Sequence, residues 1–419
     1  MIADDVIVVG GGPAGAATAF ALARTGARVA ILDRARFPRS KPCAECLSPQ
    51  TSSILEEMGA LAAVEQAGAA RLAGMIVYAP NGARIAGHFV ADHGYRAPGD
   101  CGLALSRVLL DGILLDRARA AGARVEEGVH VTDLARDAEG RVTGVITRSE
   151  SGPGAARPAR LVVGADGLHS VVARKMGVAR RWPWPRRLAL TTHYRDVMGI
   201  GAFGEMHVAR DGYVGLADVG GGLVNVSAVF PRRAAPSIAP DPTAFLEQWL
   251  SRQPSLAPRF AGARRTEDVR AVGPFASHAR QAWTPGALLV GDAADFFDPF
   301  TGEGIYSALR GGQLAALYAR AALDATSSAE VDVALAAYDR ARRHEFGGKW
   351  AVERAIGAVV SNAPLINRAA RASEAWPAMA DLLVGVAGDF VPAREVMRPG
   401  FLFRLFARPL PAVRSASRE

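Results

Sequence analysis

The sequence contains little cysteine, little lysine and no long uncharged run, and each scarcity excludes a class of protein. Three cysteines in 419 residues are too few for a disulfide framework. The lysines are Lys41, Lys175 and Lys349, and the arginines are scattered among alanines rather than gathered in one basic tract, so we expect no nucleic-acid partner. Because no run of about eighteen uncharged apolar residues is present, we expect membrane contact to be peripheral at most.

Apolar sequence is abundant, with 50% hydrophobic residues against 21% charged residues. This balance indicates a folded globular protein, and the length predicts two or three domains. The first residues, Met1 to Asp5, carry acidic side chains where a secretion signal needs basic ones. We therefore expect a cytoplasmic protein.

Short apolar runs alternate with helix-favouring segments through much of the chain. Strands are expected at 6–9 and 27–32, and helices at 14–24, 51–65, 107–121, 243–252 and 304–323. Residues 142–147 and 159–163, joined by a polar loop at 151–154, predict an antiparallel hairpin. Alternating segments with glycine turns from 188 to 230 predict a second sheet, and the sequence after 331 is typical of helices.

Residues 10–15 read G-G-G-P-A-G, a G-x-G-x-x-G that follows a strand and begins a helix, as dinucleotide-binding turns do. Gly10 allows the tight turn, Gly12 lets a pyrophosphate approach the backbone, and Gly15 lets the helix and strand pack closely. The free N–H groups at the start of the helix attract phosphate. Asp33, after the next strand, can accept hydrogen bonds from a ribose and repels a 2′-phosphate, so the sequence predicts FAD or NAD.

Two further motifs resemble those of one flavoprotein family. Residues 162–170, V-V-G-A-D-G-L-H-S, resemble its Asp-Gly motif, and residues 291–305 resemble its Gly-Asp motif. With the N-terminal fingerprint they make residues 5–325 similar to the para-hydroxybenzoate hydroxylase-type FAD-dependent oxidoreductases. The resemblance implies bound FAD and an α/β fold, in which a Rossmann-like FAD-binding domain carries an inserted antiparallel substrate-binding sheet and a helical C-terminal region.

This resemblance also implies a division of the chain. The FAD-binding domain is expected to comprise three parts, at 1–74, 101–187 and 273–330. Strands of the substrate domain are expected at 75–100, the substrate-binding sheet at 188–272, and the helical C-terminal region at 331–419.

The physical chemistry of these motifs agrees with FAD contacts. Asp292 follows an apolar strand, where a carboxylate can hold ribityl hydroxyls, and residues 302–305 begin a long helix whose free N–H groups would face the flavin pyrimidine. The resemblance adds Arg107 for the pyrophosphate, the backbone of Val131 for the adenine, and Asp166 between FAD and a nicotinamide. The predicted cofactor-binding residues are Gly10, Gly12, Ala14, Gly15, Asp33, Arg34, Lys41, Cys43, Ala44, Arg107, Val131, Asp166, Asp292, Pro299, Gly302, Glu303, Gly304 and Ile305. Two of these residues also have a purely structural interpretation: Arg107 could be a solvated residue at the start of a helix, and Asp166 could cap a turn.

Residues 39–49, R-S-K-P-C-A-E-C-L-S-P, are similar to a Lys-x-Cys-Gly-Glu-x-Leu-Ser-Pro stretch of the geranylgeranyl reductase and flavin halogenase branch. In the reductases the first cysteine lies near the isoalloxazine and influences proton delivery, so this resemblance makes Cys43 the candidate catalytic residue. Its alternative is a small packing residue. Ala44 replaces the usual glycine, which questions any role that needs a positive φ at that position.

Other interpretations of these residues are less favoured. Cys43 and Cys46 form a C-x-x-C, which elsewhere indicates thiol exchange or half a metal site, but no second Cys pair or His cluster completes a zinc site, so we expect no metal. The segment Trp182-Pro-Trp184-Pro resembles a halogenase W-x-W signature, yet its prolines predict a rigid connector. Flavin halogenases also place a lysine above the flavin from an early substrate-side strand, and residues 42–174 contain none.

The substrate side is less well defined by the sequence. Candidates for a pocket wall, each with solvent or a packed sheet as its alternative, are His193, Tyr194, Arg195, Met206, His207, Tyr213 and Asn225. Residues 220–222 predict a hairpin turn, and no second G-x-G-x-x-G begins a helix, so the expected electron donor is transiently docked NAD(P)H or a reduced carrier from a partner reductase. The tail at 401–406, flanked by arginines, is either a membrane-facing segment or a packed terminal helix.

These observations predict an FAD-dependent monooxygenase (hydroxylase) that acts on an aromatic or apolar small molecule. It would use a flavin C4a-(hydro)peroxide protected from water. The alternative is a geranylgeranyl reductase-like reduction of isoprenoid C=C bonds. A flavin halogenase and a non-catalytic flavin-binding sensor are the less favoured hypotheses.

Overall fold

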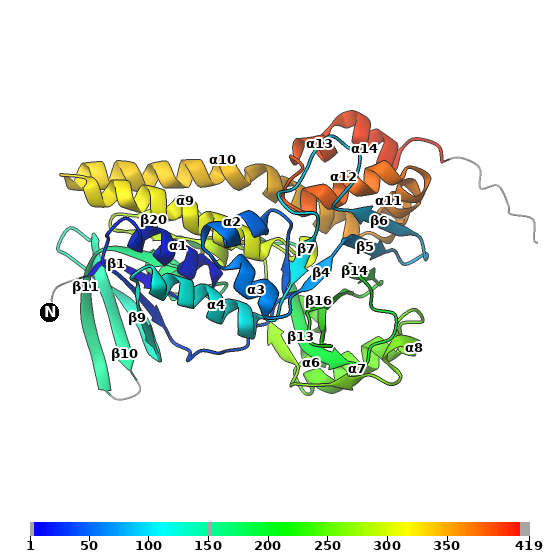
Figure 1. The fold of residues 1–419 in the computed structure, drawn as a ribbon, viewed down its shortest axis with the longest axis horizontal. Helices are drawn as coiled ribbons and strands as arrows, with labels where there is room; N and C mark the ends of the chain where they lie inside the picture. The colour runs from blue at the N-terminus through cyan, green and yellow to red at the C-terminus, as the bar shows by residue number, and fades with distance from the viewer. Residues whose placement is uncertain (1–3, 150–151, 411–419) are drawn as a thin grey trace, which may run out of the picture.

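The structure is a computed structural model that describes residues 4–149 and 152–410. Parts of the expected loop at 151–154 and of the expected end regions therefore lie outside the described residues. Figure 1 shows a parallel sheet with helices over it at one end of the molecule, a second sheet at the other end, and C-terminal helices beside the second sheet. The expected fold class is confirmed: this is an α/β, Rossmann-like FAD-binding fold with an inserted sheet and a helical C-terminal region.

The first sheet has the strand order β20-β21-β11-β1-β2-β8. These strands are β1 (Asp4–Val9), β2 (Val29–Asp33), β8 (Arg124–Glu127), β11 (Gly152–Gly164), β20 (Trp283–Thr284) and β21 (Ala287–Leu289). β1 pairs in parallel with both β2 and β11, as expected for strands separated by crossovers. The first half of β11 instead pairs with β10 (Val142–Ser149), which pairs with β9 (Val129–Arg136). An antiparallel hairpin is therefore present, but the expected partner was wrong: β10 pairs with residues 152–158, whereas residues 159–163 pair in parallel with β1 because they continue into the central sheet.

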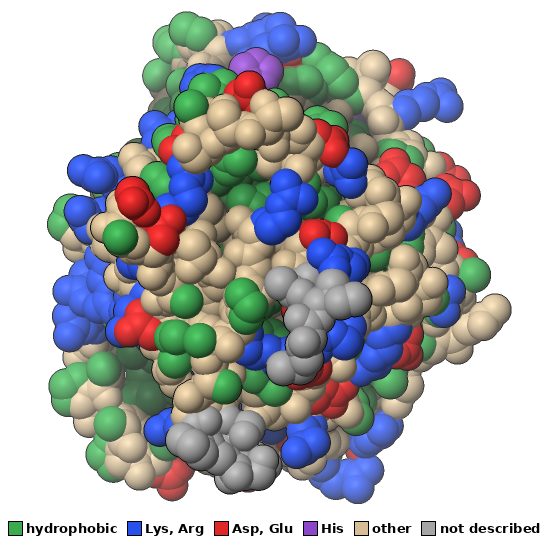
Figure 2. All heavy atoms as spheres, turned by 90° about the vertical axis from the view of Figure 1, so that its left-hand side faces the viewer, with side chains coloured by type: hydrophobic (Ala, Val, Ile, Leu, Met, Phe, Trp, Pro, Cys, Tyr) green, Lys and Arg blue, Asp and Glu red, His purple; other side chains and the backbone are tan. Residues whose placement is uncertain are grey.

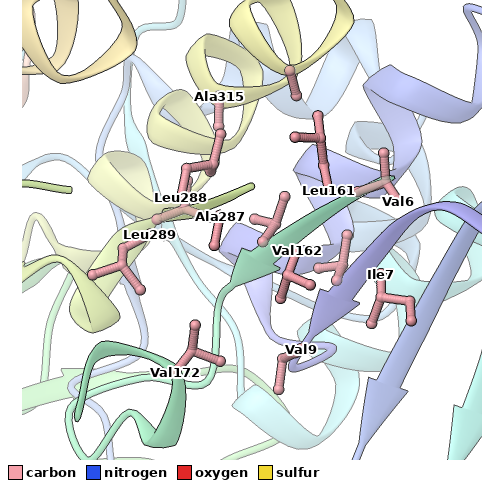
Figure 3. Packing of buried hydrophobic residues seen from close by; sticks show 14 of the residues in the cluster. Val6, Ile7, Val9, Leu161, Val162, Val172, Ala287, Leu288, Leu289 and Ala315 are labelled. Carbon is pink, nitrogen blue, oxygen red and sulfur yellow. The ribbon is translucent and has the colours of Figure 1, made fainter. Parts of the chain in front are cut away.

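The core of this domain lies between the parallel strands and the long helix α9 (Gly304–Asp324) (Figure 3). Ile7, Val162 and Leu288 are at most 1% exposed. Strands buried on both faces need continuous apolar runs, which is why the motifs read V-I-V-V, L-V-V and A-L-L-V before each functional turn. The close packing fixes the carboxyl ends of these strands, where the functional turns begin.

Helices cover the sheet and include one correction. α1 (Pro13–Ala23) begins with proline, whose missing N–H costs nothing at a helix start, and it packs against α9 and α4 (Arg107–Ala120). The single helix expected at 51–65 is two helices, α2 (Thr51–Glu57) and α3 (Leu61–Gln66). The reason is Gly59, whose φ of 66° ends the first helix.

The second sheet, called the substrate sheet below, has the order β17-β13-β16-β15-β14-β5-β6, with β18 also paired to β13. Its strands are β5 (Gly74–Tyr78), β6 (Arg84–His88), β13 (Arg187–Arg195), β14 (Phe203–Val208), β15 (Tyr213–Asp218), β16 (Val224–Pro231), β17 (Arg264–Arg265) and β18 (Arg270–Val272). The sheet is mixed rather than wholly antiparallel, because β5 and β14 pair in parallel where the two inserted segments meet. The hairpin turn expected at 220–222 joins β15 to β16.

Short elements complete the molecule. Two small sheets have the orders β3-β7-β4 and β12-β19-β22 and consist of β3 (Cys46–Leu47), β4 (Ala70–Leu72), β7 (Gly102–Ala104), β12 (Ala179–Arg181), β19 (Ser277–Ala279) and β22 (Asp295–Phe296). The remaining helices are α5 (Val171–Lys175), α6 (Ala235–Ile238), α7 (Pro242–Ser251), α8 (Ala257–Phe260), α10 (Ser328–Val360), α11 (Ala363–Ala375), α12 (Pro377–Ala387), α13 (Arg394–Met397) and α14 (Pro399–Phe406). Three 3-10 turns lie at η1 (Arg232–Ala234), η2 (Gly291–Ala293) and η3 (Pro299–Thr301).

The C-terminal region joins the two ends of the molecule. α10 packs along α9 and then continues to α11 and α12, which cover β6 of the substrate sheet (Figure 1). The segment 401–406 is part of α14, which packs on α11 and buries Leu405 while Phe403 stays 57% exposed. Within residues 4–149 and 152–410, no helix combines the length and the apolar character needed to cross a membrane.

The end of the molecule that carries the parallel sheet has a mixed charge pattern. Figure 2 shows basic and acidic side chains interspersed over this face. In the domain of the parallel sheet, Arg28 pairs with Asp5 and Arg124 pairs with Asp4. Surface pairs of this kind contribute little to stability individually.

Candidate active site

The dinucleotide turn between β1 and α1 requires its glycines for different reasons. A Cβ at Gly15 would lie 1.9 Å from the carbonyl oxygen of Gly10, so no side chain fits there. Gly10 itself has a φ of 104°, a conformation that favours glycine. A Cβ at Gly12 would meet only guanidinium nitrogens, at 3.6 Å from Arg39 and 3.8 Å from Arg107. Gly12 therefore leaves its backbone open toward two cations, which suits a pyrophosphate.

Asp33 secures this turn from the neighbouring strand. Its carboxylate accepts the N–H of Gly11 at 2.7 Å and that of Ala35 at 2.8 Å, and the residue is 6% exposed. It thus stands at the end of β2, where the sequence predicts the adenosine ribose. Arg34 follows it and is exposed, while Val131 is buried in β9.

A buried ion cluster lies beside the turn. Arg107, 4% exposed at the start of α4, donates two hydrogen bonds to Asp111, at 2.7 and 2.8 Å. Arg39 reaches the same carboxylate at 3.0 Å. Two guanidinium groups share one carboxylate, so the cluster keeps net positive charge facing Gly12. Arg107 is therefore not the solvated residue of its alternative interpretation.

A cavity of about 510 Å³ extends from the dinucleotide turn to the substrate sheet. The predicted cofactor-binding residues that line it are Gly12, Ala14, Lys41, Cys43, Ala44, Arg107, Asp292, Pro299, Gly302, Glu303, Gly304 and Ile305. Others lie outside its lining, namely Gly10, Gly15, Asp33, Arg34, Val131 and Asp166. The first three of these shape the turn from behind, so the structure brings most of the predicted set together around one cavity.

The part of the cavity lined by the predicted cofactor-binding residues is called the cofactor cradle below. Its end away from the dinucleotide turn is formed by η2, η3 and the start of α9. Asp292 follows β21 and lies 3.6 Å from the ammonium of Lys41. Gly302 adopts a φ of 73° and lets the chain turn into α9, whose first N–H groups face the cavity edge. A carboxylate for ribityl hydroxyls and free N–H donors for a pyrimidine are what an FAD requires at these positions, so the described residues fit that cofactor.

Glu303 is held at this end by a residue that the sequence did not single out. The Lys349 ammonium lies 3.0 Å from the Glu303 carboxylate and also contacts Asp389. Burial raises the pKa of Glu303, and the charge of Lys349 opposes that rise. Glu353, one turn further along α10, also lines the cavity. Burial and the negative charge of Glu303 raise the pKa of Glu353 to about 8, so it holds its proton at neutral pH.

The loop of residues 43–45 forms the cavity wall between cradle and substrate sheet. The Cys43 carbonyl accepts hydrogen bonds from Asn225, at 2.8 Å, and from Ser227, at 3.2 Å. Its thiol sulfur accepts the N–H of Glu45 at 3.3 Å and borders the cavity. The left-handed residue of this loop is Glu45, with a φ of 63°, and Ala44 has no positive φ, so alanine is tolerated where glycine is usual.

The two cysteines of the C-x-x-C differ in environment. Both are free thiols, as is Cys101. Burial raises the pKa of Cys46 to about 12, and the negative charges available to Cys43 and Glu45 add to that rise. Its thiol donates to the carbonyl of Ala44 at 3.4 Å and does not line the cavity. Because a reactive thiol needs an accessible thiolate, Cys46 is unsuited to exchange chemistry.

Asp166 is used by its own helix. Its carboxylate accepts the Ser170 hydroxyl at 2.6 Å and the N–H of Val171 at 2.6 Å, and so caps the start of α5. Burial raises its pKa, against the lowering effect of these hydrogen bonds. The cap is the alternative that the sequence left open, and the contact with a nicotinamide stays a prediction.

The substrate sheet presents alternate residues to the cavity, as a period-two strand must. Met206 and Tyr213 line the cavity, as do Thr191 and Ser227, whose hydroxyls lie 3.3 Å apart. The rest of this wall is apolar, with Ala189, Val229, Val272 and Phe275. The polar pair is therefore set in an otherwise apolar surface.

The other candidates on this sheet lie elsewhere. His193 and Asn225 face the 43–45 loop, and Tyr194 packs edge-on against Phe260 in the opposite layer. Arg195 is exposed, and His207 pairs with Glu205. The sequence predicted that side chains alternate between the two faces of these strands, but it did not predict which face meets the cofactor.

Tyr213 has a second role at the cavity wall. Its hydroxyl donates to Asp298 at 2.6 Å, and Arg187 donates to the same carboxylate at 2.5 Å. Burial and the charge of Asp298 raise the pKa of Tyr213 well above its usual range. Near the other end of the cavity, Trp182 stacks on His278 with ring centroids 4.6 Å apart, so the Trp-Pro connector also contributes to the lining.

Comparisons with known proteins cover most of this arrangement. The family model described as "FAD binding domain" matches residues 3–344, which include every predicted cofactor-binding residue. Digeranylgeranylglycerophospholipid reductase 2 of Methanopyrus kandleri is 31% identical over 328 residues, 76% of this chain and 78% of that protein. Menaquinone reductase of Mycobacterium tuberculosis is 31% identical over 331 residues, 74% of this chain and 75% of that protein. The structure of the myxobacterial chondrochloren halogenase CndH, described as a variant of FAD-dependent halogenases, matches with a TM-score of 0.77 at 26% identity, over 84% of this chain and 82% of that one.

Proposed function

Because the chain belongs to the FAD binding domain family of flavin-dependent oxidoreductases, we propose that it reduces carbon–carbon double bonds in a polyprenyl-bearing molecule. This was the alternative in the sequence-based interpretation. Two relatives at 31% identity carry names that specify a reductase and a lipid with isoprenoid chains. FAD would supply the two-electron chemistry, and the chain would bind, orient and protonate.

The observation that carries the proposal is the composition of the cavity wall. A polyprenyl chain offers no charge and few hydrogen-bonding groups, so its site must be apolar. Ala189, Val229 and Val272 supply such a surface from the substrate sheet, and Phe275 supplies it from the segment after β18. The opposite wall, at Cys43 and Glu45, carries groups able to hold a proton.

These two walls divide the work of the reaction. Reduction of a double bond requires an electron pair and proton at one carbon and a second proton at the other. The apolar wall would hold the chain and exclude water, while the 43–45 loop would place a proton source beside it. The donor of electrons remains NAD(P)H docked transiently or a reduced carrier, because residues 10–15 make up the one G-x-G-x-x-G of the sequence that begins a helix.

An aromatic hydroxylase is the second candidate, and one observation favours it. Thr191 and Ser227 place two hydroxyls 3.3 Å apart in the apolar wall. Such a pair could anchor a phenol or a carbonyl of an aromatic substrate. We rank this candidate second because the single hydroxyl hydrogen of Ser227 is already shared between the Asn225 amide oxygen, at 2.8 Å, and the Cys43 carbonyl, at 3.2 Å. Halogenation ranks below both. Lys41 lines the cavity, Lys349 lies on α10 and Lys175 pairs with Asp133 on the surface, so none of the lysines lies on the substrate-sheet wall of the described cavity.

The test is anaerobic turnover of the FAD-loaded protein. The protein is reduced with one equivalent of dithionite and mixed with a digeranylgeranyl glycerophospholipid or with a menaquinone. We expect flavin colour to return with at least one of them, and the product to have gained two hydrogens on carbon atoms of its polyprenyl chain. Reduction of the quinone ring alone, which adds its hydrogens to oxygen, would count against the proposal. Glu45→Gln should slow that step at least about tenfold, as loss of a proton donor does, while Cys46→Ala, outside the cavity, should leave it unchanged. Reoxidation by neither probe without oxygen would overturn the proposal.

A further inference from the structure

His193 lies between two carboxylates. Its Nε2 is 2.6 Å from Oε2 of Glu45, and its Nδ1 is 2.6 Å from Oε1 of Glu267. His193 belongs to β13, in the substrate sheet, whereas Glu45 belongs to the loop that borders the cofactor cradle. The bridge therefore connects the two halves of the candidate active site.

Glu45 is the inner end of this bridge. It is 3% exposed in a left-handed conformation and borders the cavity next to Cys43. Its second oxygen, Oε1, accepts the backbone N–H of Arg107 at 2.7 Å, and Oε2 also accepts the side-chain amide of Asn225 at 3.0 Å. Asn225 lies opposite His193 on the adjacent strand, β16 beside β13. Both side chains therefore form hydrogen bonds with the Glu45 carboxylate.

Glu267 is the outer end. Its side chain is 27% exposed, compared with 11% for His193 and 3% for Glu45. The chain of groups therefore goes from the protein surface, through one imidazole, to the cavity wall. Apart from Glu45 and Glu267, the charged and titratable groups around it are Cys43, Arg107 and Asp111 on the cradle side and Arg265 and Asp268 on the outer side.

Two carboxylates around one ring favour the form of histidine with both nitrogens protonated. Burial alone would lower the pKa of His193, but the hydrogen bonds and charges of Glu45 and Glu267 outweigh it and raise that pKa. A neutral ring would leave one of the two 2.6 Å contacts without a hydrogen, unless a carboxylate carried it. A contact that only held the 43–45 loop in place would not require an ionisable side chain such as the His193 imidazole.

We propose that Glu45 is the proton donor of the cavity wall and that His193, oriented by Glu267, holds the proton that Glu45 delivers. The Nε2–H bond of His193 breaks as an O–H bond forms on the Glu45 carboxylate, and that O–H bond breaks in turn as the proton passes to an acceptor in the cavity. Glu267 holds the remaining Nδ1–H and stabilises the cation beforehand, as the acid of a Ser-His-Asp triad does. The net change is one proton gained by the acceptor and one lost by His193, which water reaching the emptied cavity restores.

This inference rests on the proposed function for the identity of the acceptor, a carbon of the reduced double bond. Its geometry does not depend on that identity. His193 and Glu267 act through Glu45, so both are positioning residues. Replacing Glu267 must therefore change the proton affinity of His193, because loss of a purely structural contact would leave the titration of the His193 ring unchanged.

The test compares Glu267→Gln with Glu247→Gln in the FAD-loaded protein. Glu247 is a matched control, since it lies in the same region, 52% exposed and 3.3 Å from Arg265, and makes no contact with His193. With ¹⁵N-labelled histidine, loss of signals in His193→Gln identifies the ring. We expect both ring nitrogens to be protonated at pH 7, and the midpoint of their titration to fall by about one pH unit in Glu267→Gln and not at all in Glu247→Gln.

A pH profile of anaerobic flavin reoxidation by the polyprenyl probe supplies the functional readout. The high-pH limb should shift downward in Glu267→Gln, stay in place in Glu247→Gln and be partly restored in Glu267→Asp. A neutral His193 ring at pH 7, or an unmoved limb in Glu267→Gln, overturns the inference and leaves the proposed function standing. If neither probe is reduced, the proposed function fails, and the NMR titration still decides the inference: a charged ring whose midpoint falls in Glu267→Gln supports it, and any other result overturns it.

Discussion

Lys349 places its ammonium nitrogen 3.0 Å from the carboxylate of Glu303 and so connects the middle of α10 to the start of α9. The same ammonium contacts Asp389, beyond α12. All three side chains are at most 15% exposed. The C-terminal region, to which the sequence assigned no part in the cofactor site, therefore holds one end of the cradle in place.

Replacing Lys349 should destabilise the folded protein. Lys349→Met leaves two buried carboxylates without a cation, so we expect the free energy of unfolding to fall by ~3–5 kcal/mol and the purified protein to contain less FAD. The control is Lys175→Met, since that lysine pairs with Asp133 on the surface and is 43% exposed. It should lose at most ~1 kcal/mol. Equal urea midpoints for the two variants would contradict the role given to Lys349.

The double variant Lys349→Met, Glu303→Gln should recover part of the loss. Removing one of the stranded charges reduces the penalty, so the two substitutions should be non-additive. Strict additivity of the two single changes would show that Lys349 and Glu303 do not interact in solution.

Two glycines of the dinucleotide turn should separate folding from cofactor binding. Gly15→Ala places a methyl group 1.9 Å from the Gly10 carbonyl oxygen, so we expect a lower melting temperature even without FAD. Gly12→Ala meets nothing closer than 3.6 Å, so the apoprotein should melt like the wild type while FAD affinity falls at least about tenfold, equal to ~1.4 kcal/mol. Differential scanning fluorimetry and fluorescence titration with FAD measure the two effects. Unchanged FAD affinity in Gly12→Ala would place the pyrophosphate elsewhere.

The carboxylate of Asp33 should contribute to the affinity of the protein for FAD. Asp33→Ala removes a charge-assisted hydrogen bond to the ribose, worth roughly 1.5–3 kcal/mol, so FAD affinity should fall by about ten- to a hundredfold. The substitution also removes the acceptor for the N–H of Gly11. Asp116→Ala, on the exposed face of α4, is the control and should bind FAD normally. Full retention of FAD by Asp33→Ala on dilution would refute the assignment.

The buried carboxyl of Glu353 should make stability depend on pH. Its pKa is raised to about 8, so between the unfolded value and about 8 the folded protein binds a proton that the unfolded chain does not. The unfolding free energy therefore falls as the pH rises through this window. Glu353→Gln removes this loss, and the variant should gain on the order of 4 kcal/mol over the wild type between pH 5 and about pH 9. A constant difference in melting temperature across that range would show that Glu353 is ionised throughout.

Local sequence predicted the cofactor half of this site because each motif there follows from backbone requirements. Gly10, Gly15 and Asp33 are dictated by one turn, and Gly302 by another. Apolar runs before these turns identified the buried strands. The helix expected at 51–65 was wrong because one glycine outweighed its propensity.

The other half depends on contacts between segments far apart in the chain. The roles of Glu267 and Lys349 have no local signal in the sequence, because each depends on a partner more than 40 residues away: His193 for Glu267 and Glu303 for Lys349. His193 was among the candidates for the cavity wall, yet it faces Glu45. Alternation along β13 tells which residues share a face, whereas only tertiary packing decides what that face meets.

Isotope incorporation into the product tests the central claim most directly. The FAD-loaded protein, its electron donor and the digeranylgeranyl glycerophospholipid or menaquinone probe react in D₂O under ¹⁸O₂, and the product is analysed by mass spectrometry. A double-bond reductase must take a proton from its cavity wall and none of its atoms from oxygen, so we predict carbon-bound deuterium in the polyprenyl chain of the product and no ¹⁸O. A product that contains ¹⁸O would contradict the account and establish oxygen chemistry in its place.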